Sequence, residues 1–162
     1  MQPPVWLIWS NSTRYIEEGN CPMRMADDIG LIHFIGIGGI GMSALARYFK
    51  VLGKNVSGYD RVATTLTKQL EDEGIPIHYE DNIKQVDSKV RNNPEQSVIV
   101  YTPAVPISHT ELNYFKDKDY TIYKRAEVLG LVTRETFTIG IGGTHGKTTT
   151  SCMVAYLLRN AG

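Results

Sequence analysis

Residues 31–41 read Leu-Ile-His-Phe-Ile-Gly-Ile-Gly-Gly-Ile-Gly, an apolar run of five residues that leads into a Gly-x-Gly-x-x-Gly pattern beginning at Gly36. A short apolar run bounded by glycine is typical of a buried parallel strand. Apolar residues then recur at helical spacing, which predicts a helix over 41–52. A strand, a glycine turn and a helix in this order are the opening unit of a Rossmann-like fold.

The rest of the chain continues the alternation of strands and helices. We expect further strands at 55–59, 76–79, 97–101 and 120–123, and further helices at 64–73, 109–116 and 125–131. Strands that alternate with helices predict a parallel sheet with flanking helices, so the fold class is α/β.

The pattern predicts three parts, with residues 30–133 as the Rossmann-like domain. Residues 134–162 hold one strand at 136–141, a second glycine loop and one helix at 147–160. These elements are too few to bury a core by themselves. We therefore expect this part to be the start of an ATP-binding domain and the chain to be a fragment.

Residues 1–29 have no clear hydrophobic period and contain both tryptophans of the chain. We expect a disordered tail, or an artefact of start assignment with the natural start at Met23 or Met25. The alternative is a real extension that packs Trp6 and Trp9 on the body of the protein.

Composition excludes several classes of protein. The chain has 162 residues, 42% hydrophobic and 21% charged, with a formal net charge of zero. These values are typical of a globular protein and do not favour nucleic acid as a partner. Two cysteines with no Cys-x-x-Cys or Cys/His cluster around them indicate neither a disulfide framework nor a zinc site, so a cytoplasmic location is expected. No apolar run approaches the ~20 residues that span a membrane, so no membrane insertion is expected.

The first glycine loop has the spacing of a dinucleotide-binding turn. Gly36 permits the tight turn, Gly38 lets the backbone approach a phosphate, and Gly41 lets the helix pack on the strand. Asp60 closes the next strand, where an acidic side chain can accept hydrogen bonds from a ribose or a base. An NAD-dependent enzyme would use the same loop, so this motif leaves the nucleotide open.

The second glycine loop is Gly143-Thr144-His145-Gly146-Lys147-Thr148-Thr149. It departs from the P-loop pattern, because Ile141 stands where the first glycine would fall. Backbone N–H groups can still surround a phosphate, Lys147 can reach the β- and γ-phosphates, and the Thr148 hydroxyl can bind Mg²⁺. This loop has no task in a dehydrogenase.

The second loop, extended to Thr150, resembles the ATP loop of the Mur ligases. Residues 35–43 resemble the first loop of the branch that joins L-alanine to UDP-N-acetylmuramate. The resemblance covers about residues 31–162. It implies an ATP-dependent ligase of peptidoglycan precursor synthesis that works through an acyl phosphate, with ATP and Mg²⁺ as cofactors and UDP-N-acetylmuramate and L-alanine as partners.

The resemblance also implies which residues form each site. The first loop would hold the diphosphate of the UDP-sugar and not NAD. The UDP-sugar residues are Gly36, Gly38, Gly39, Ile40, Gly41, Met42, Ser43, Asp60, Thr102 and Arg125. The ATP residues are Gly143, Thr144, His145, Gly146, Lys147, Thr148 and Thr149. Lys147 and His145 would be catalytic, with His145 positioning the muramyl carboxylate or the γ-phosphate, and Thr148 would bind Mg²⁺.

The remaining chemically reactive residues have no motif around them. We expect His33 to be a satisfied core residue and Cys152 to be a packing residue, and His78 and His109 receive no role. Two other functions stay open: an NAD(P)-dependent oxidoreductase domain, or a non-enzymatic sensor that binds the precursor. We expect the fragment to bind UDP-N-acetylmuramate without turning over.

Overall fold

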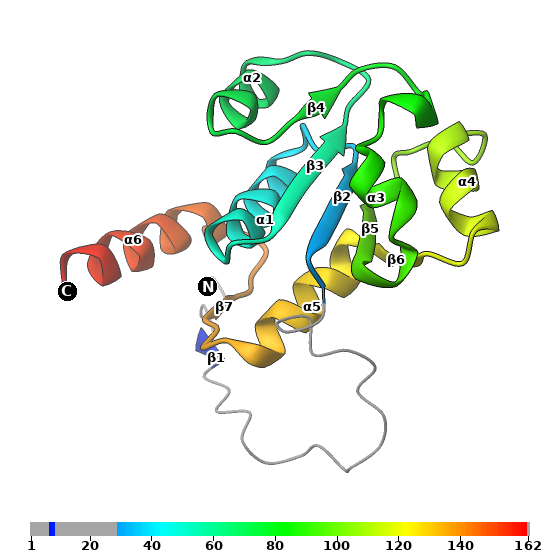
Figure 1. Ribbon diagram of the computed structural model, residues 1–162. Helices are drawn as coiled ribbons and strands as arrows, with labels where there is room; N and C mark the ends of the chain where they lie inside the picture. The colour runs from blue at the N-terminus through cyan, green and yellow to red at the C-terminus, as the bar shows by residue number, and fades with distance from the viewer. Residues whose placement is uncertain (1–6, 9–28, 162) are drawn as a thin grey trace, which may run out of the picture. The chain divides into compact units, whose positions relative to one another are not determined.

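The structure is a computed structural model that describes residues 7–8 and 29–161 (Figure 1). The described chain divides into two compact units, one formed by residues 29–131 and the other by residues 132–161 together with 7–8. None of the helices in these ranges is long and apolar enough to cross a membrane.

The first unit is built on a five-stranded parallel sheet in the order β4-β3-β2-β5-β6. Its strands are β2 (Leu31–Ile35), β3 (Asn55–Tyr59), β4 (Ile77–His78), β5 (Ser97–Tyr101) and β6 (Thr121–Lys124). The central strand β2 has β3 on one side and β5 on the other. The chain first adds β3 and β4 on one side of β2 and then crosses to add β5 and β6 on the other side, so the strand order reverses at the boundary between β2 and β5. Ligands of such sheets bind at this point, beyond the carboxyl ends of the strands.

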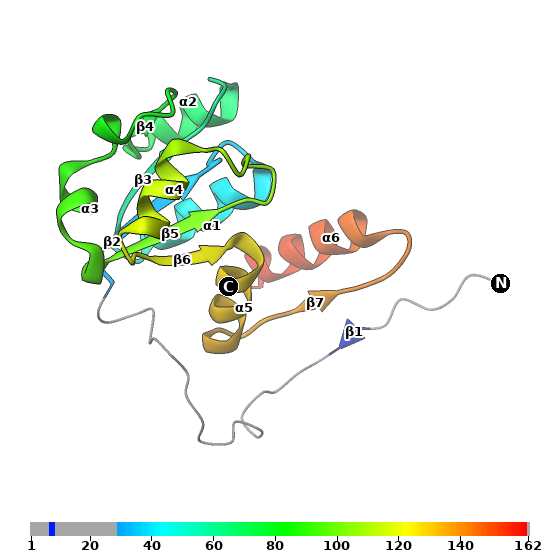
Figure 2. The same cartoon turned by 90° about the vertical axis from the view of Figure 1, so that its right-hand side faces the viewer.

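Helices cover both faces of this sheet (Figure 2). They are α1 (Ile40–Val51), α2 (Thr65–Asp72), α3 (Ser88–Asn92), α4 (Thr110–Asp117) and α5 (Arg125–Glu135), with 3-10 turns η1 (Ile83–Gln85) and η2 (Pro94–Gln96). Because side chains of a strand alternate between faces, Phe34 meets Phe49 of α1, whereas Leu31 and Ile35 pack in the core with Phe115 of α4. His33 shares the α4 face with Leu31 and Ile35.

The predicted α/β class and alternation are confirmed in the first unit, with most element bounds within one residue. The helix predicted at 125–131 continues to Glu135. The helix α3 and the two 3-10 turns were not predicted, because five residues or fewer are too short to show a period.

The second unit contains β7 (Gly140–Ile141) and α6 (Lys147–Asn160), and β1 (Leu7–Ile8) pairs antiparallel with β7. The strand predicted at 136–141 is wrong in length, because only its last two residues are in β7. The hydroxyls of Thr136 and Thr138 donate instead to backbone carbonyls at the end of α5. Such local hydrogen bonds compete with a strand ladder.

No side chain of α6 is buried in the described unit. Cys152 is therefore exposed, and the expectation that it packs in a core is wrong for this structure. Apart from Leu7, Ile8 and Ile29, the expectation about residues 1–29 lies outside the described residues.

Candidate functional site

A cavity of about 790 Å³ lies where the strands of the first unit end. The segments after β2, β3 and β5 line it, together with the first residue of α5. Its size is in the range of small-molecule sites. Of the UDP-sugar residues predicted from sequence, Gly36, Gly39, Ile40, Gly41, Met42, Asp60, Thr102 and Arg125 line the cavity.

The two predicted residues that do not line the cavity are Gly38 and Ser43. The N–H of Gly38 donates to Oδ2 of Asp60 at 2.7 Å. A Cβ added at Gly38 would lie 2.8 Å from that oxygen and 2.9 Å from Cγ2 of Thr67. The close approach that requires a glycine here is therefore made by Asp60 and Thr67 of the protein itself. Ser43 is buried, and its hydroxyl donates to the carbonyl of Ile40.

Asp60 holds two backbone segments at once. Besides the Gly38 N–H, it accepts the N–H of Val62 on Oδ1 at 3.1 Å. A carboxylate has about four lone-pair positions, so each oxygen can still accept a hydrogen bond from a ligand. Asp60 therefore lines the cavity and also holds the glycine loop to the turn after β3 through these two hydrogen bonds.

One end of the cavity can bind an anion. Helix α1 begins at Ile40, and no side chain caps its N-terminus in the described structure. Free N–H groups and the helix dipole favour negative charge at such a position. The exposed guanidinium of Arg125 lies directly over Gly41, where an added Cβ would collide with it. Gly41 therefore makes room for Arg125, and the two features together give a positive site for phosphate.

The cavity is also lined by Tyr59, Asp81 and His109. Burial, and after it the nearby carboxylates, raise the pKa of Tyr59. Asp81 accepts the N–H groups of Thr110 and Glu111 at 2.8 and 3.1 Å, and so anchors the start of α4.

His109 also caps α4, because its Nδ1 accepts the N–H of Leu112 at 3.3 Å. Nδ1 also lies 3.3 Å from Oδ1 of Asp81. Since a helix N–H needs an acceptor, we assign Nδ1 of His109 as the acceptor of this bond. The sequence assigned His109 no role, although a polar residue directly before a helix is a signal for a cap.

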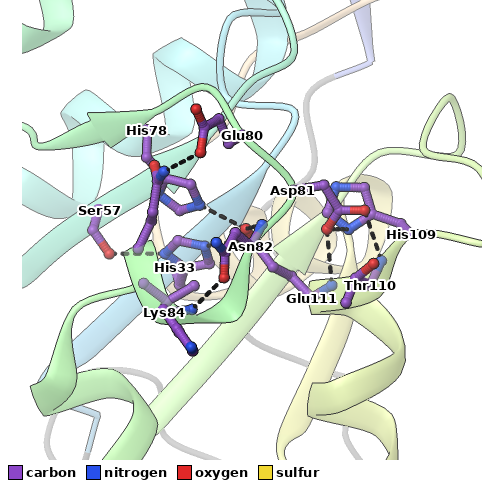
Figure 3. A network of polar contacts seen from close by, with 12 residues as sticks. His33, Ser57, His78, Glu80, Asp81, Asn82, Lys84, His109, Thr110 and Glu111 are labelled. Carbon is purple, nitrogen blue, oxygen red and sulfur yellow. Dashed lines mark hydrogen bonds and ion pairs between the residues drawn. The ribbon is translucent and has the colours of Figure 1, made fainter.

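A second group of polar side chains lies inside the unit, between the sheet and α4 (Figure 3). His33 of β2 and Glu111 of α4 are fully buried, and His78 of β4 is mostly buried. Nε2 of His78 is 2.7 Å from Oε1 of Glu111, and Nε2 of His33 is 3.6 Å from Oε2. The sequence motifs did not predict this cluster, because its members are separated by 33 or more residues along the chain.

The pKa values of Glu111 and His33 are shifted from their ordinary values. Burial raises the pKa of Glu111, but the neighbouring imidazoles of His33 and His78 outweigh that effect and lower the pKa to about 2. Burial lowers the pKa of His33. Glu111 is therefore ionised near pH 7.

The second glycine loop, in the other unit, connects β7 to α6. Gly143 and Gly146 have φ values of 147° and 76°, which side chains rarely adopt. No side chain caps the N-terminus of α6 at Lys147 in the described structure. The Lys147 ammonium donates to the carbonyls of Gly143 and Thr144 at 2.7 and 3.4 Å, across the loop. His145 is exposed, with Nδ1 3.2 Å from the Thr144 hydroxyl.

These features suit a phosphate. Glycines that allow the loop to curl, the free N-terminus of a 14-residue helix, and an ammonium group beside it are features that favour an anion.

Comparison with known proteins matches the chain to a family of ligases. The profile of the Mur ligase family, catalytic domain, matches residues 31–136. A UDP-N-acetylmuramate–L-alanine ligase of Flavobacterium johnsoniae is 53% identical over 131 residues, which are 81% of this chain and 29% of that protein. The corresponding ligase of Christiangramia forsetii is 49% identical over 140 residues, 86% of this chain and 31% of that protein. The chain thus spans about three tenths of these relatives.

Solved structures agree with the sequence matches. A UDP-N-acetylmuramate:L-alanyl-gamma-D-glutamyl-meso-diaminopimelate ligase from Neisseria meningitides has a TM-score of 0.69 and 29% identity, and the match covers 83% of this chain and 40% of that one. A UDP-N-acetylmuramate-alanine ligase from Thermotoga maritima has a TM-score of 0.57 and 30% identity, covering 65% of this chain and 23% of that one.

Proposed function

Because the chain belongs to the Mur ligase family, we propose that its first unit binds UDP-N-acetylmuramate and that the complete ligase joins L-alanine to this sugar nucleotide at the expense of ATP. The observation that carries the proposal is the anion site, where the N-terminus of α1 and the guanidinium of Arg125 meet in one cavity. A diphosphate fits this site, since helix N–H groups and a guanidinium both bind phosphate oxygens.

Different lining residues of the cavity then contact different parts of the ligand. The diphosphate would lie over Gly39, Ile40 and Gly41, next to Arg125. The uridine would reach Asp60, whose remaining lone pairs can accept from hydroxyl or N–H groups. A cavity of about 790 Å³ is large enough for such a ligand.

For the second unit we propose ATP binding. The N–H groups from Gly143 to Thr149 would surround the β-phosphate, and Lys147 would move from its two carbonyl acceptors to the β- and γ-phosphates. Thr148 would bind Mg²⁺, which neutralises phosphate charge when it is present. His145, exposed at the loop, would position the carboxylate that reacts or the γ-phosphate.

The reaction that these sites serve is amide formation. A carboxylate oxygen of the sugar nucleotide attacks the γ-phosphorus of ATP, the bond to the β,γ-bridging oxygen breaks, and ADP leaves. The amine of L-alanine attacks the acyl phosphate, loses a proton and expels inorganic phosphate. Lys147 and the loop N–H groups would stabilise the charge on the transferred phosphoryl group. We propose this turnover for the complete ligase and ligand binding alone for the chain described here.

Titration calorimetry on the chain tests the binding proposal, with UDP-N-acetylmuramate and NADH titrated in parallel. We expect a saturable signal with the sugar nucleotide and none with NADH. Arg125→Gln should weaken the sugar-nucleotide signal. Its matched control is Arg134→Gln, at an exposed arginine of the same helix α5, which should bind as the wild type does. Tight NADH binding without a sugar-nucleotide signal would contradict the proposal and favour an oxidoreductase.

The sensor alternative differs in the second loop. A protein that only reports the precursor has no need of ATP, so Lys147→Ala would leave its behaviour unchanged. Phosphate release by the complete ligase, dependent on both UDP-N-acetylmuramate and L-alanine and lost in Lys147→Ala, would exclude the sensor. Absence of phosphate release from the complete protein would favour it.

A further inference from the structure

The buried cluster of His33, His78 and Glu111 is not part of the cavity or of the second glycine loop, and the reaction proposed above does not use it. A carboxylate and two imidazoles placed inside a hydrophobic layer are costly unless every polar atom has a partner. Their arrangement therefore needs an explanation of its own.

Two atoms of the cluster lack a hydrogen-bond partner among the described residues, namely Nε2 of His33 and Oε2 of Glu111. Both side chains are fully buried, and the two atoms face each other at 3.6 Å. This separation exceeds the length of a hydrogen bond.

The other atoms of these side chains are held in place. Nδ1 of His33 lies 2.9 Å from the hydroxyl of Ser57 on β3. Oε1 of Glu111 accepts the N–H of Asn82 at 3.1 Å and faces Nε2 of His78 at 2.7 Å. If Nδ1 of His33 donates to Ser57, then Nε2 presents a lone pair to a carboxylate oxygen, and a cation between the two atoms would satisfy both.

We propose that His33, His78 and Glu111 form a buried binding site for one divalent transition-metal ion of the zinc class. One donor atom from each residue lies within 4.8 Å of the other two. With metal–ligand bonds of ~2.0 Å, the 3.6 Å between His33 and Glu111 corresponds to an angle of about 128° at the metal, so a small approach of the two side chains would give a tetrahedral site.

The chemistry of the donors selects this class of ion. Two imidazoles and one carboxylate suit zinc and its neighbours, whereas Mg²⁺ prefers oxygen ligands. A histidine ligand commonly donates its other ring N–H to an acceptor, and a ligating carboxylate is commonly hydrogen-bonded in turn. Ser57 meets the first condition for His33, and the Asn82 N–H meets the second for Glu111.

His78 completes the site by a small movement. Its Nε2 now lies against Oε1 of Glu111, and it would turn from that oxygen to the metal. The side chain is 12% exposed at the edge strand β4, so it has more freedom than the two fully buried ligands. The ion would connect β2, β4 and α4, and a water molecule would take the fourth position.

Metal content of the purified chain tests the proposal. The protein is treated with a chelator, exchanged into buffer, and incubated with a small excess of zinc chloride. Mass spectrometry then measures the bound metal after gel filtration. We expect about one zinc per chain, a higher melting temperature with zinc than with magnesium, and a tetrahedral visible spectrum when cobalt(II) replaces zinc.

Variants assign the zinc to the cluster. Glu111→Gln and His78→Phe should each lose the bound zinc and the zinc-dependent rise in melting temperature. The control carries Cys21→Ser, Cys152→Ser and His145→Ala, which remove other zinc-binding side chains and should keep one zinc per chain. Because Glu111→Gln can fail to fold, its circular dichroism is recorded, and His78→Phe at the partly exposed position gives the second reading.

The proposal is overturned if the wild-type chain retains no zinc, or if zinc stays bound in both cluster variants. It is also overturned if the control loses zinc, since the ion would then belong to the cysteines or the loop histidine. None of these results depends on whether the chain binds UDP-N-acetylmuramate, so a failure here leaves the proposed function untouched.

Discussion

The carboxylate of Asp60 accepts the backbone N–H of Gly38 at 2.7 Å, which joins the end of β3 to the glycine loop that follows β2. The sequence pattern assigned the acidic residue to a ribose and the glycine to a phosphate. In the structure these two residues bind each other, and this hydrogen bond holds the loop in shape without a ligand. A preformed loop lowers the entropic cost of binding.

Asp60→Asn should therefore weaken both folding and binding. The Asn side chain has one acceptor oxygen, so its NH₂ group would face the N–H of Gly38 or of Val62. We expect a loss of roughly 1–3 kcal/mol in the free energy of unfolding. Urea denaturation measures it, with the exposed Asp72→Asn as the control. Equal stability of the two variants would contradict this role.

Gly38→Ala and Gly41→Ala should act differently. At Gly38 the new methyl group meets Asp60 and Thr67, so we expect the free energy of unfolding to fall by roughly 1–3 kcal/mol and the melting temperature to fall with it. At Gly41 it meets only the mobile end of Arg125, so stability should be kept and affinity for the sugar nucleotide should fall. Gly30→Ala is the matched control, with open space around the new methyl group. Identical effects of the first two variants would refute the distinction.

Arg125→Gln should reduce the affinity for UDP-N-acetylmuramate by roughly 10- to 100-fold, which is the usual value of a charged hydrogen bond to phosphate. Because the guanidinium is exposed, the melting temperature should not change. Calorimetry and a thermal melt provide the two readings. Unchanged affinity would indicate that the diphosphate does not bind beside Arg125 at the N-terminus of α1.

Lys147→Ala should remove Mg·ATP binding by the second glycine loop. The ammonium group is the cationic side chain that lies across this loop, where it contacts the carbonyls of Gly143 and Thr144. NMR shifts of the loop amides on addition of Mg·ATP can report even weak binding. We expect shifts in the wild type, smaller or absent shifts in Lys147→Ala, and unchanged behaviour in Arg159→Ala at the other end of α6. Equal shifts in all three proteins would count against an ATP loop.

Acid should destabilise the metal-free protein through Glu111. Its pKa is lowered to about 2 from a reference value of 4.5, so the native state binds fewer protons than the unfolded state between these values. The stabilisation is fully present above the unfolded pKa and is lost as pH falls toward about 2. The shift corresponds to something on the order of 3 kcal/mol.

Urea denaturation with a chelator present, from pH 7 down to pH 3, measures this dependence. We expect stability to fall with pH in the wild type and more gently in Glu111→Gln. Asp72→Asn, at an exposed position of α2, is the control and should follow the wild type. Parallel curves for the wild type and Glu111→Gln would show that the buried carboxylate is not the source.

The local elements of this protein could be read from its sequence. The apolar run at 31–35, the helical spacing that follows it and the two glycine loops each depend on neighbouring residues, so the α/β class and the positions of both glycine loops were predicted from them. The length of the strand at 136–141 was overestimated because the prediction used local preference alone. Threonine favours strands, but here the Thr136 hydroxyl donates to a nearby backbone carbonyl, and such bonds compete with strand pairing.

The tertiary structure alone decided which residues meet across the chain. His33, His78 and Glu111 come from two strands and a helix, and no spacing rule connects them. Gly38 and Gly41 belong to one motif, yet Asp60 with Thr67 crowds the first and Arg125 the second. The physical reason is that a periodic pattern records which face of an element is buried, whereas the partner on that face is set by how the sheet and helices pack.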